Sequence, residues 1–147
     1  MACSAYSFAQ DPPPNPETWR KIADPDKRLR AALYDIYDYY GRKRQLLANL
    51  YRDAEMPAVA VALDRRRKAL ARAVEILTEA WSEAGVASSR FVPAAIGHAL
   101  DFTTWQSLIE RQRLSNAECI EAMLLFVQTI GASSLLVDPP REHEGYV

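Results

Sequence analysis

The chain has 147 residues, which is enough for one domain that buries about 70% of the surface exposed by its unfolded chain. Its 18 basic and 19 acidic residues give a formal net charge of −1, which provides no electrostatic footprint for nucleic acid, an acidic substrate or an anionic membrane surface. Two distant cysteines, Cys3 and Cys119, exclude a disulfide framework, and no basic segment followed by an apolar core marks a signal peptide. We therefore expect a cytoplasmic protein.

The first 18 residues are expected to hold a short helical piece, 1–11, followed by a stiff connector. Four of the five residues from 12 to 16 are prolines, and each proline lacks a backbone donor and restricts the residue before it. An ordinary loop that Trp19 pins to the domain is favoured over a ligand for a proline-recognition module, because nothing else in the chain points to such a partner.

The first long helix is predicted to begin at Asp24, with a capping carboxylate followed by Pro25 at the first helical position. It should run to about Tyr40, where Gly41 is expected to interrupt it, and residues 42–55 should continue as a second or kinked helix. The buried stripe is expected to hold Leu29, Leu33, Ile36, Tyr37 and Tyr40, and the solvent side Arg28, Arg30, Asp35 and Asp38.

Four tyrosines gather between residues 34 and 40. Because a tyrosine has an apolar body and a polar tip, several together could line a ligand cavity and orient a guest through their hydroxyls. The alternative, which stays open, is a helix whose tyrosines pack inward while their hydroxyls reach water.

Pro57 marks the start of the next helix, which is predicted to run to about Trp81. The basic run at residues 65–68 is interpreted as a solvated helix face, because a phosphate-binding site usually combines several such patches with an overall basic charge.

Residues 90–131 are predicted to form two helices folded back on each other, more apolar than one small domain needs. The second helix should open at Ser115, with Glu118 completing a capping box. Since few later residues could cover this hairpin, a second copy is expected to do so, giving a homodimer. The apolar run at 122–127 is too short to cross a bilayer. The predicted interface residues are Ile96, Leu100, Leu108, Ile120, Met123, Leu124, Phe126 and Val127.

No motif for chemistry is found: the chain has no glycine-rich phosphate loop, no Cys-x-x-Cys and no H-E-x-x-H, and its two histidines, His98 and His143, are far apart. We expect neither an enzyme nor a metal or cofactor site. His98 has Asp101 three residues on, but a His/Asp pair without a nucleophile is not a catalytic arrangement. A core or interface histidine is favoured over a ligand contact.

Three segments carry a resemblance to a known family: D-P-x-x-R-L-R-A-A-L at residues 24–33, L-A-N-L-Y-R-D at 47–53 and F-x-x-W-x-S-L at 102–108. With them, residues 19–132 resemble the C-terminal domain of TetR-family transcriptional regulators. The resemblance implies a domain that dimerises through its last two helices and binds a small effector among its central helices. The implied ligand-binding candidates are Tyr34, Tyr37, Tyr51, His98, Phe102 and Trp105.

The chain departs from that family at its beginning. Only 18 residues precede Trp19, and none of them is a lysine or arginine, so DNA binding would need a head domain not present here. Residues 1–9 resemble the start of the helix that joins head to body in the family. Two interpretations of the chain stay open: it is a fragment of a regulator, or it is a natural remnant of one.

The sequence therefore predicts a single all-α domain, 19–132, of five or six helices, with a linker, 1–18, and a tail, 133–147. We expect it to sense a hydrophobic or aromatic small molecule and to form a homodimer, with no cofactor and no membrane partner. The alternative is a stand-alone helical module that binds another protein through the same apolar hairpin.

Overall fold

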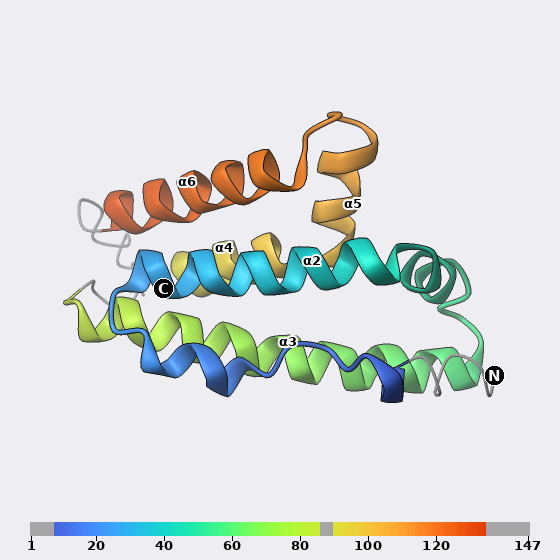
Figure 1. The fold of residues 1–147 in the computed structure, drawn as a ribbon. Coiled ribbons are helices and arrows are strands. Elements are labelled where there is room, and N and C mark those ends of the chain that lie inside the picture. The colour runs from blue at the N-terminus through green and yellow to red at the C-terminus, as the bar shows by residue number, and fades with distance from the viewer. Residues whose placement is uncertain (1–7, 86–89, 135–147) are drawn as a thin grey trace, which may run out of the picture.

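A computed structural model describes residues 8–85 and 90–134 of the chain. Throughout these two ranges the regular structure is helical and no strand occurs, so the predicted all-α fold is confirmed (Figure 1). In chain order the elements are the 3-10 helix η1 (Pro16–Lys21) and the α-helices α2 (Pro25–Arg52), α3 (Pro57–Glu83), α4 (Phe91–Leu100), α5 (Phe102–Glu110) and α6 (Asn116–Ser134). The sequence predictions for residues 1–7 and 135–147 lie outside the described ranges.

The helix starts follow the local chemistry predicted for them. The Asp24 carboxylate accepts a hydrogen bond of 2.8 Å from the backbone N–H of Lys27, and Pro25 occupies the first turn of α2. Before α6, the Ser115 hydroxyl accepts from the Glu118 N–H at 3.2 Å, and the Glu118 carboxylate accepts from the Ser115 N–H at 2.7 Å. This reciprocal pair is the predicted capping box.

Of the two predictions for residues 42–55, a separate second helix is wrong, because α2 continues through Gly41 as one helix of 28 residues. A glycine in a helix interior costs about 1 kcal/mol relative to alanine. Buried residues on both sides, Tyr39, Tyr40 and Leu47, offset this cost, since each is at most 1% exposed.

The prediction of only two helices over residues 90–131 is also wrong, because Asp101 divides the first of them into α4 and α5. Asp101 has an extended backbone (φ −68°, ψ 135°), and its carboxylate accepts from the Thr103 N–H at 2.8 Å as the N-cap of α5. The last carbonyls of α4 are then satisfied from α2: the Tyr37 hydroxyl donates to Ala99 O and the Tyr40 hydroxyl to Leu100 O, both at 2.5 Å. Apolar residues recur at helical spacing on both sides of Asp101, so the periodicity alone predicts one continuous helix.

The helices pack as one bundle around α2. Figure 1 shows α3 running beside α2 on one side and α6 on the other, while α4 lies behind α2 and packs against both α3 and α6. The short helix α5 turns steeply between α4 and α6. The predicted hairpin is formed by α4 and α6, with α5 as the connection at one end. The core of this bundle includes Leu29, Leu33, Ile36, Tyr37, Leu77, Ile96, Leu100, Phe102 and Val127. Within the described residues, no helix is long and apolar enough to cross a bilayer.

Two contacts fasten η1 to this bundle. Trp19 is 2% exposed, and its indole N–H donates to the Asp35 carboxylate at 2.8 Å, which confirms the predicted pin. Arg28, predicted on the solvent side of α2, is instead only 3% exposed. Its guanidinium donates to three backbone carbonyls, those of Ile22 at 2.6 Å, Ile76 at 2.9 Å and Arg20 at 3.1 Å. These charge-assisted hydrogen bonds compensate its burial and join η1, α2 and α3.

Candidate ligand pocket

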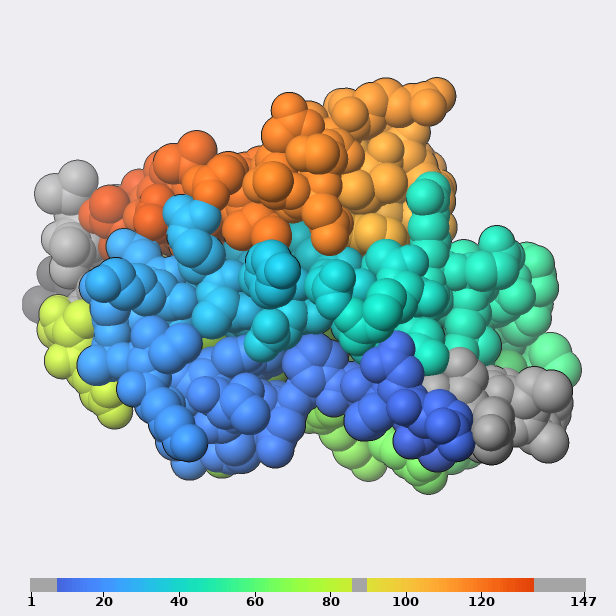
Figure 2. Space-filling model, viewed as in Figure 1, coloured from blue at the N-terminus to red at the C-terminus, as the bar shows by residue number. Residues whose placement is uncertain are grey.

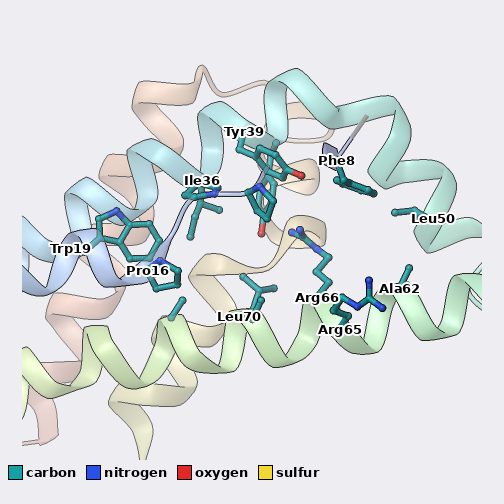
Figure 3. Close-up of a pocket in the computed structure, with 15 residues that line it drawn as sticks. Phe8, Pro16, Trp19, Ile36, Tyr39, Leu50, Ala62, Arg65, Arg66 and Leu70 are labelled. Carbon is teal, nitrogen blue, oxygen red and sulfur yellow. The ribbon is translucent and has the colours of Figure 1, made fainter. Parts of the chain in front are cut away.

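A pocket lies between α2, α3 and the segment that leads into η1 (Figure 3). Its volume is about 270 Å³. Pockets for small ligands begin near 300 Å³, so this one suits a guest of modest size. The lining residues are Phe8, Pro13, Pro14, Pro16, Trp19, Ile36, Tyr39, Tyr40, Leu50, Ala62, Arg65, Arg66, Ala69, Leu70 and Ala73.

Small residues on α3 leave the room that this pocket occupies. Ala62, Ala69 and Ala73 lie where larger side chains would reach across to α2. From Ala62 to Ala73 the wall extends about 16 Å along α3, at 1.5 Å per residue. The pocket is therefore elongated along the helix and mostly apolar, which favours an extended apolar guest.

The proline-rich wall of the pocket is fastened at both ends. Figure 2 shows the dark-blue N-terminal segment lying against the outer face of the bundle. At one end the Asp11 carboxylate accepts two hydrogen bonds from the Arg42 guanidinium, at 3.1 and 3.2 Å, and lies 3.6 Å from the Lys43 ammonium. The hydrogen bond from Arg42 is the main cause that holds the pKa of Asp11 below its ordinary value. At the other end Glu17 pairs with Arg72 at 3.0 Å.

Two buried polar groups in the pocket have no hydrogen-bond partner among the described residues. They are the Tyr39 hydroxyl and the Nε and Nη2 atoms of the Arg66 guanidinium. Burial raises the pKa of the Tyr39 phenol, which keeps it neutral and able to donate. The Arg66 guanidinium lies over the Tyr40 ring, 5.0 Å from its centroid, and Tyr51 also interacts with it. Buried groups of this kind normally have a partner.

Of the four basic residues at 65–68, two line this pocket and two lie on the solvent face. Arg67 and Lys68 are 79% and 80% exposed and pair with Asp64, as expected of a solvated face. Arg65 and Arg66 line the pocket instead, so the predicted solvated face is wrong for Arg66. The reason is the helical period: residues one position apart point about 100° apart, so one run serves two faces.

None of the six predicted ligand-binding residues lines the pocket. Tyr34 is 65% exposed on the outside of the bundle, whereas Tyr37 and Phe102 are fully buried in the core. Trp105 is also buried, and its indole N–H donates to Asn116 Oδ1 at 2.7 Å. The Tyr37 hydroxyl is engaged at the end of α4, where it donates to Ala99 O. Of the six, Tyr51 interacts with the pocket residue Arg66, and Tyr37, Phe102 and Trp105 pack against the pocket residue Tyr40.

His98 is exposed, so of the two expected roles the core histidine is wrong and the interface histidine stays a prediction. Its Nδ1 lies 3.4 Å from the Thr104 hydroxyl, and its ring meets that of Phe126 edge-on at 5.8 Å between centroids. The Asp101 carboxylate accepts hydrogen bonds from the backbone N–H and the hydroxyl of Thr103, which is its role as the cap of α5.

The pocket residues that the sequence analysis missed are chiefly Tyr39, Arg66 and the prolines of the connector. One signal was present: alanines at positions 62, 69 and 73 recur at the spacing of a single helix face. Small residues along one face indicate close approach or open space, but the sequence does not show which segment lies opposite.

Most of the predicted interface residues belong to the core of a single chain. Ile96, Leu100, Leu124 and Val127 are at most 3% exposed, so a second copy could not reach them. Ile120 is 8% exposed, and Leu108 and Met123 are half-buried. Phe126, at 37%, and the neighbouring Leu125, at 62%, form the outer face of α6. The helix is therefore covered by its own chain on more sides than its composition indicated.

Among the described residues, no group of His, Cys, Asp and Glu is arranged to hold a metal ion. Comparisons of the chain with protein-family models, with curated proteins and with solved structures find no match. The resemblance to TetR-family regulators therefore stays a prediction that rests on the motifs at residues 24–33, 47–53 and 102–108.

Proposed function

We propose that this chain is the small-molecule-binding and dimerisation domain of a TetR-like transcriptional regulator. The observation that carries the binding part is the pocket between α2, α3 and the proline-rich segment, because it joins an apolar lining to a few polar groups that lack partners. Its position differs from the one that the family resemblance implied.

Binding here would connect parts of the chain that are far apart in sequence. A guest would touch Pro14 in the connector, Tyr39 in α2 and Leu70 in α3 at once. A ligand that contacts all three stabilises the arrangement in which they lie together, and it can shift the chain between arrangements only through such differential contacts. In a sensor domain of the proposed kind, ligand binding would change the arrangement of the chain in this way.

The test of binding is a thermal-shift screen over apolar and aromatic metabolites, including ones with acidic heads. A ligand at 100 times its dissociation constant adds about 2.7 kcal/mol to the free energy of unfolding. For a domain of this size the melting temperature should rise by roughly 5 to 11 °C.

A variant that fills the pocket provides the control. In Ala62→Phe the ring should occupy part of the cavity and abolish the shift, because Ala62 lines the pocket. Ala71→Phe places the same ring at an exposed position of α3 that does not line it, and should keep the shift. A ligand that shifts both variants as it shifts the unmodified chain binds elsewhere and removes this pocket from the proposal.

The dimerisation part is supported by the outer face of α6, where Leu125 and Phe126 present apolar surface. A second copy of the same chain is the proposed cover. A complex of one copy with a different protein would support the alternative, a helical interaction module.

A further inference from the structure

We infer that the ligand of this pocket is an amphipathic carboxylic acid, whose carboxylate pairs with Arg66 while its apolar body lies along α3. The inference rests on the proposed binding function and adds the chemical class of the ligand. It comes from the arrangement of donors and charges in the pocket.

The donors of Arg66 have the form that a carboxylate requires. Nε and Nη2 together make one edge of the guanidinium, and neither has an acceptor at hydrogen-bond geometry among the described residues. The Tyr40 and Tyr51 hydroxyls interact with the guanidinium but do not meet that geometry at these two atoms. Two parallel N–H groups on one edge bind the two oxygens of a carboxylate in a bidentate pair. The Tyr39 hydroxyl, also buried without a partner, is a further donor in the same pocket. Figure 3 shows Arg66 extending from α3 toward Tyr39 on α2.

The charged side chains of the pocket are positive, as pairing with a carboxylate requires. Arg65 and Arg66 both line it, and within the described residues no carboxylate forms an ion pair with either. The nearby acids are otherwise engaged: Asp64 pairs with Arg67 and Lys68, and Asp11 with Arg42 and Lys43. A buried cation without a counter-charge is costly, so an anionic guest gains more here than a neutral one of the same shape.

The apolar part of the ligand has a path on either side of Arg66. In Figure 3, Pro16, Trp19, Ile36 and Leu70 lie on one side of Arg66, and Phe8, Leu50 and Ala62 lie on the other. Along α3 the first arm is the longer, since Ala73 is seven positions from Arg66, or about 10 Å, and Ala62 is four, or about 6 Å. A chain in the longer arm would contact the Trp19 indole, which makes tryptophan emission a direct reporter.

The experiment compares two probes that share a chain and differ in head group, sodium octanoate and 1-octanol. Each is titrated at neutral pH into the full chain while tryptophan emission and heat of binding are followed. Octanoate should bind about 10-fold to 100-fold more tightly than octanol, as expected for a charge-assisted hydrogen-bonded pair. The emission of the full chain should change with octanoate, and Trp19→Phe should lose most of that change.

Substitution of Arg66 measures the contribution of the carboxylate head group separately from that of the apolar lining. In Arg66→Gln the affinity for octanoate should fall to that for octanol, while octanol binding stays as in the unmodified chain. Arg67→Gln removes an equal charge one position away on the solvent face and should leave both affinities unchanged. Circular dichroism of both variants checks that the helices are retained.

The outcomes distinguish the two proposals. Equal affinity for octanoate and octanol, or octanoate binding that Arg66→Gln does not weaken, would overturn the carboxylate inference and leave a neutral-ligand pocket in place. Binding of neither probe at millimolar concentration would overturn this inference, and if the thermal-shift screen is also empty, the proposed binding function fails with it.

Discussion

At the scale of single residues, Tyr37 and Tyr40 hold together two helices that are about 60 positions apart in the chain. Each hydroxyl donates to a carbonyl at the end of α4, at a point where the helix leaves those carbonyls without an intrahelical partner. Burial raises the pKa of both phenols well above the ordinary tyrosine value, so both are protonated donors at neutral pH.

Tyr37→Phe should therefore lower the free energy of unfolding by about 1 to 3 kcal/mol, because Ala99 O would be left buried without its donor. The ring itself is retained, so packing changes little. Chemical denaturation with a helical signal measures the loss. Tyr34→Phe is the matched control, since Tyr34 is 65% exposed and should tolerate the change within about 0.5 kcal/mol. Equal effects of the two substitutions would show that the Tyr37 hydroxyl does not stabilise the fold.

At the scale of helices, the two glycines inside α2 and α6 have opposite surroundings. A Cβ added at Gly41 in α2 would meet nothing within 4 Å, and the residue is exposed. A Cβ at Gly131 in α6 would lie 3.1 Å from Nε1 of the buried Trp81, which is closer than ordinary van der Waals contact. Gly41 is thus free to be replaced, and Gly131 provides the space in which α6 lies against Trp81.

Gly41→Ala should raise the free energy of unfolding by about 0.5 to 1 kcal/mol, because alanine loses less backbone entropy in a helix. In Gly131→Ala the same gain is opposed by the contact with Trp81, so the variant should be less stable than Gly41→Ala and no more stable than the unmodified chain. Thermal and denaturant unfolding of both variants gives the comparison. If Gly41→Ala is destabilising, α2 is kinked or open at this point, as the sequence alone had predicted.

Helix starts could be read from the sequence because their signals are local. Asp24 with Pro25, Pro57, and Ser115 with Glu118 each act within one turn, and all three starts are where the motifs predict them. The break at Asp101 has a local part, the cap of α5, which the sequence analysis did not use. Its other part could not be predicted, because the hydroxyl groups that satisfy the end of α4 come from α2 across the bundle. Long-range partners of this kind leave no trace in helical periodicity.

The candidate pocket escaped prediction for the same reason. Pro13 and Pro14 form one wall of the pocket, and Tyr39 and Arg66 supply its polar groups. These three parts are far apart in the sequence. The tyrosine-rich segment contributes Tyr39 and Tyr40 to the pocket, but its members point in different directions around α2. Tyr37 faces α4, Tyr39 faces the pocket and Tyr34 faces solvent, as a period of 3.6 residues requires.

At the scale of the whole molecule, the question is which surface a second copy would cover. Leu124 lies in the core of its own chain at 3% exposure, so it cannot serve as a contact between copies. Leu125, at 62%, and Phe126, at 37%, lie on the outer face of α6. These two adjacent side chains are therefore the apolar surface that the proposed dimer would cover.

Leu125→Glu should therefore convert the proposed dimer to a monomer, since a carboxylate in the contact would be desolvated without a partner, typically at a cost of several kcal/mol. Phe126→Glu should act in the same direction. Both side chains reach solvent in the single chain, so helicity should be kept. Leu124→Glu serves as the contrast, because the same charge placed in the core should unfold the domain.

Sedimentation velocity at tens of micromolar, with circular dichroism alongside, separates the two effects. An unmodified chain that sediments as a monomer at that concentration would rule out this interface, and a stable complex with an unrelated protein, lost in Leu125→Glu, would assign the α6 surface to another partner.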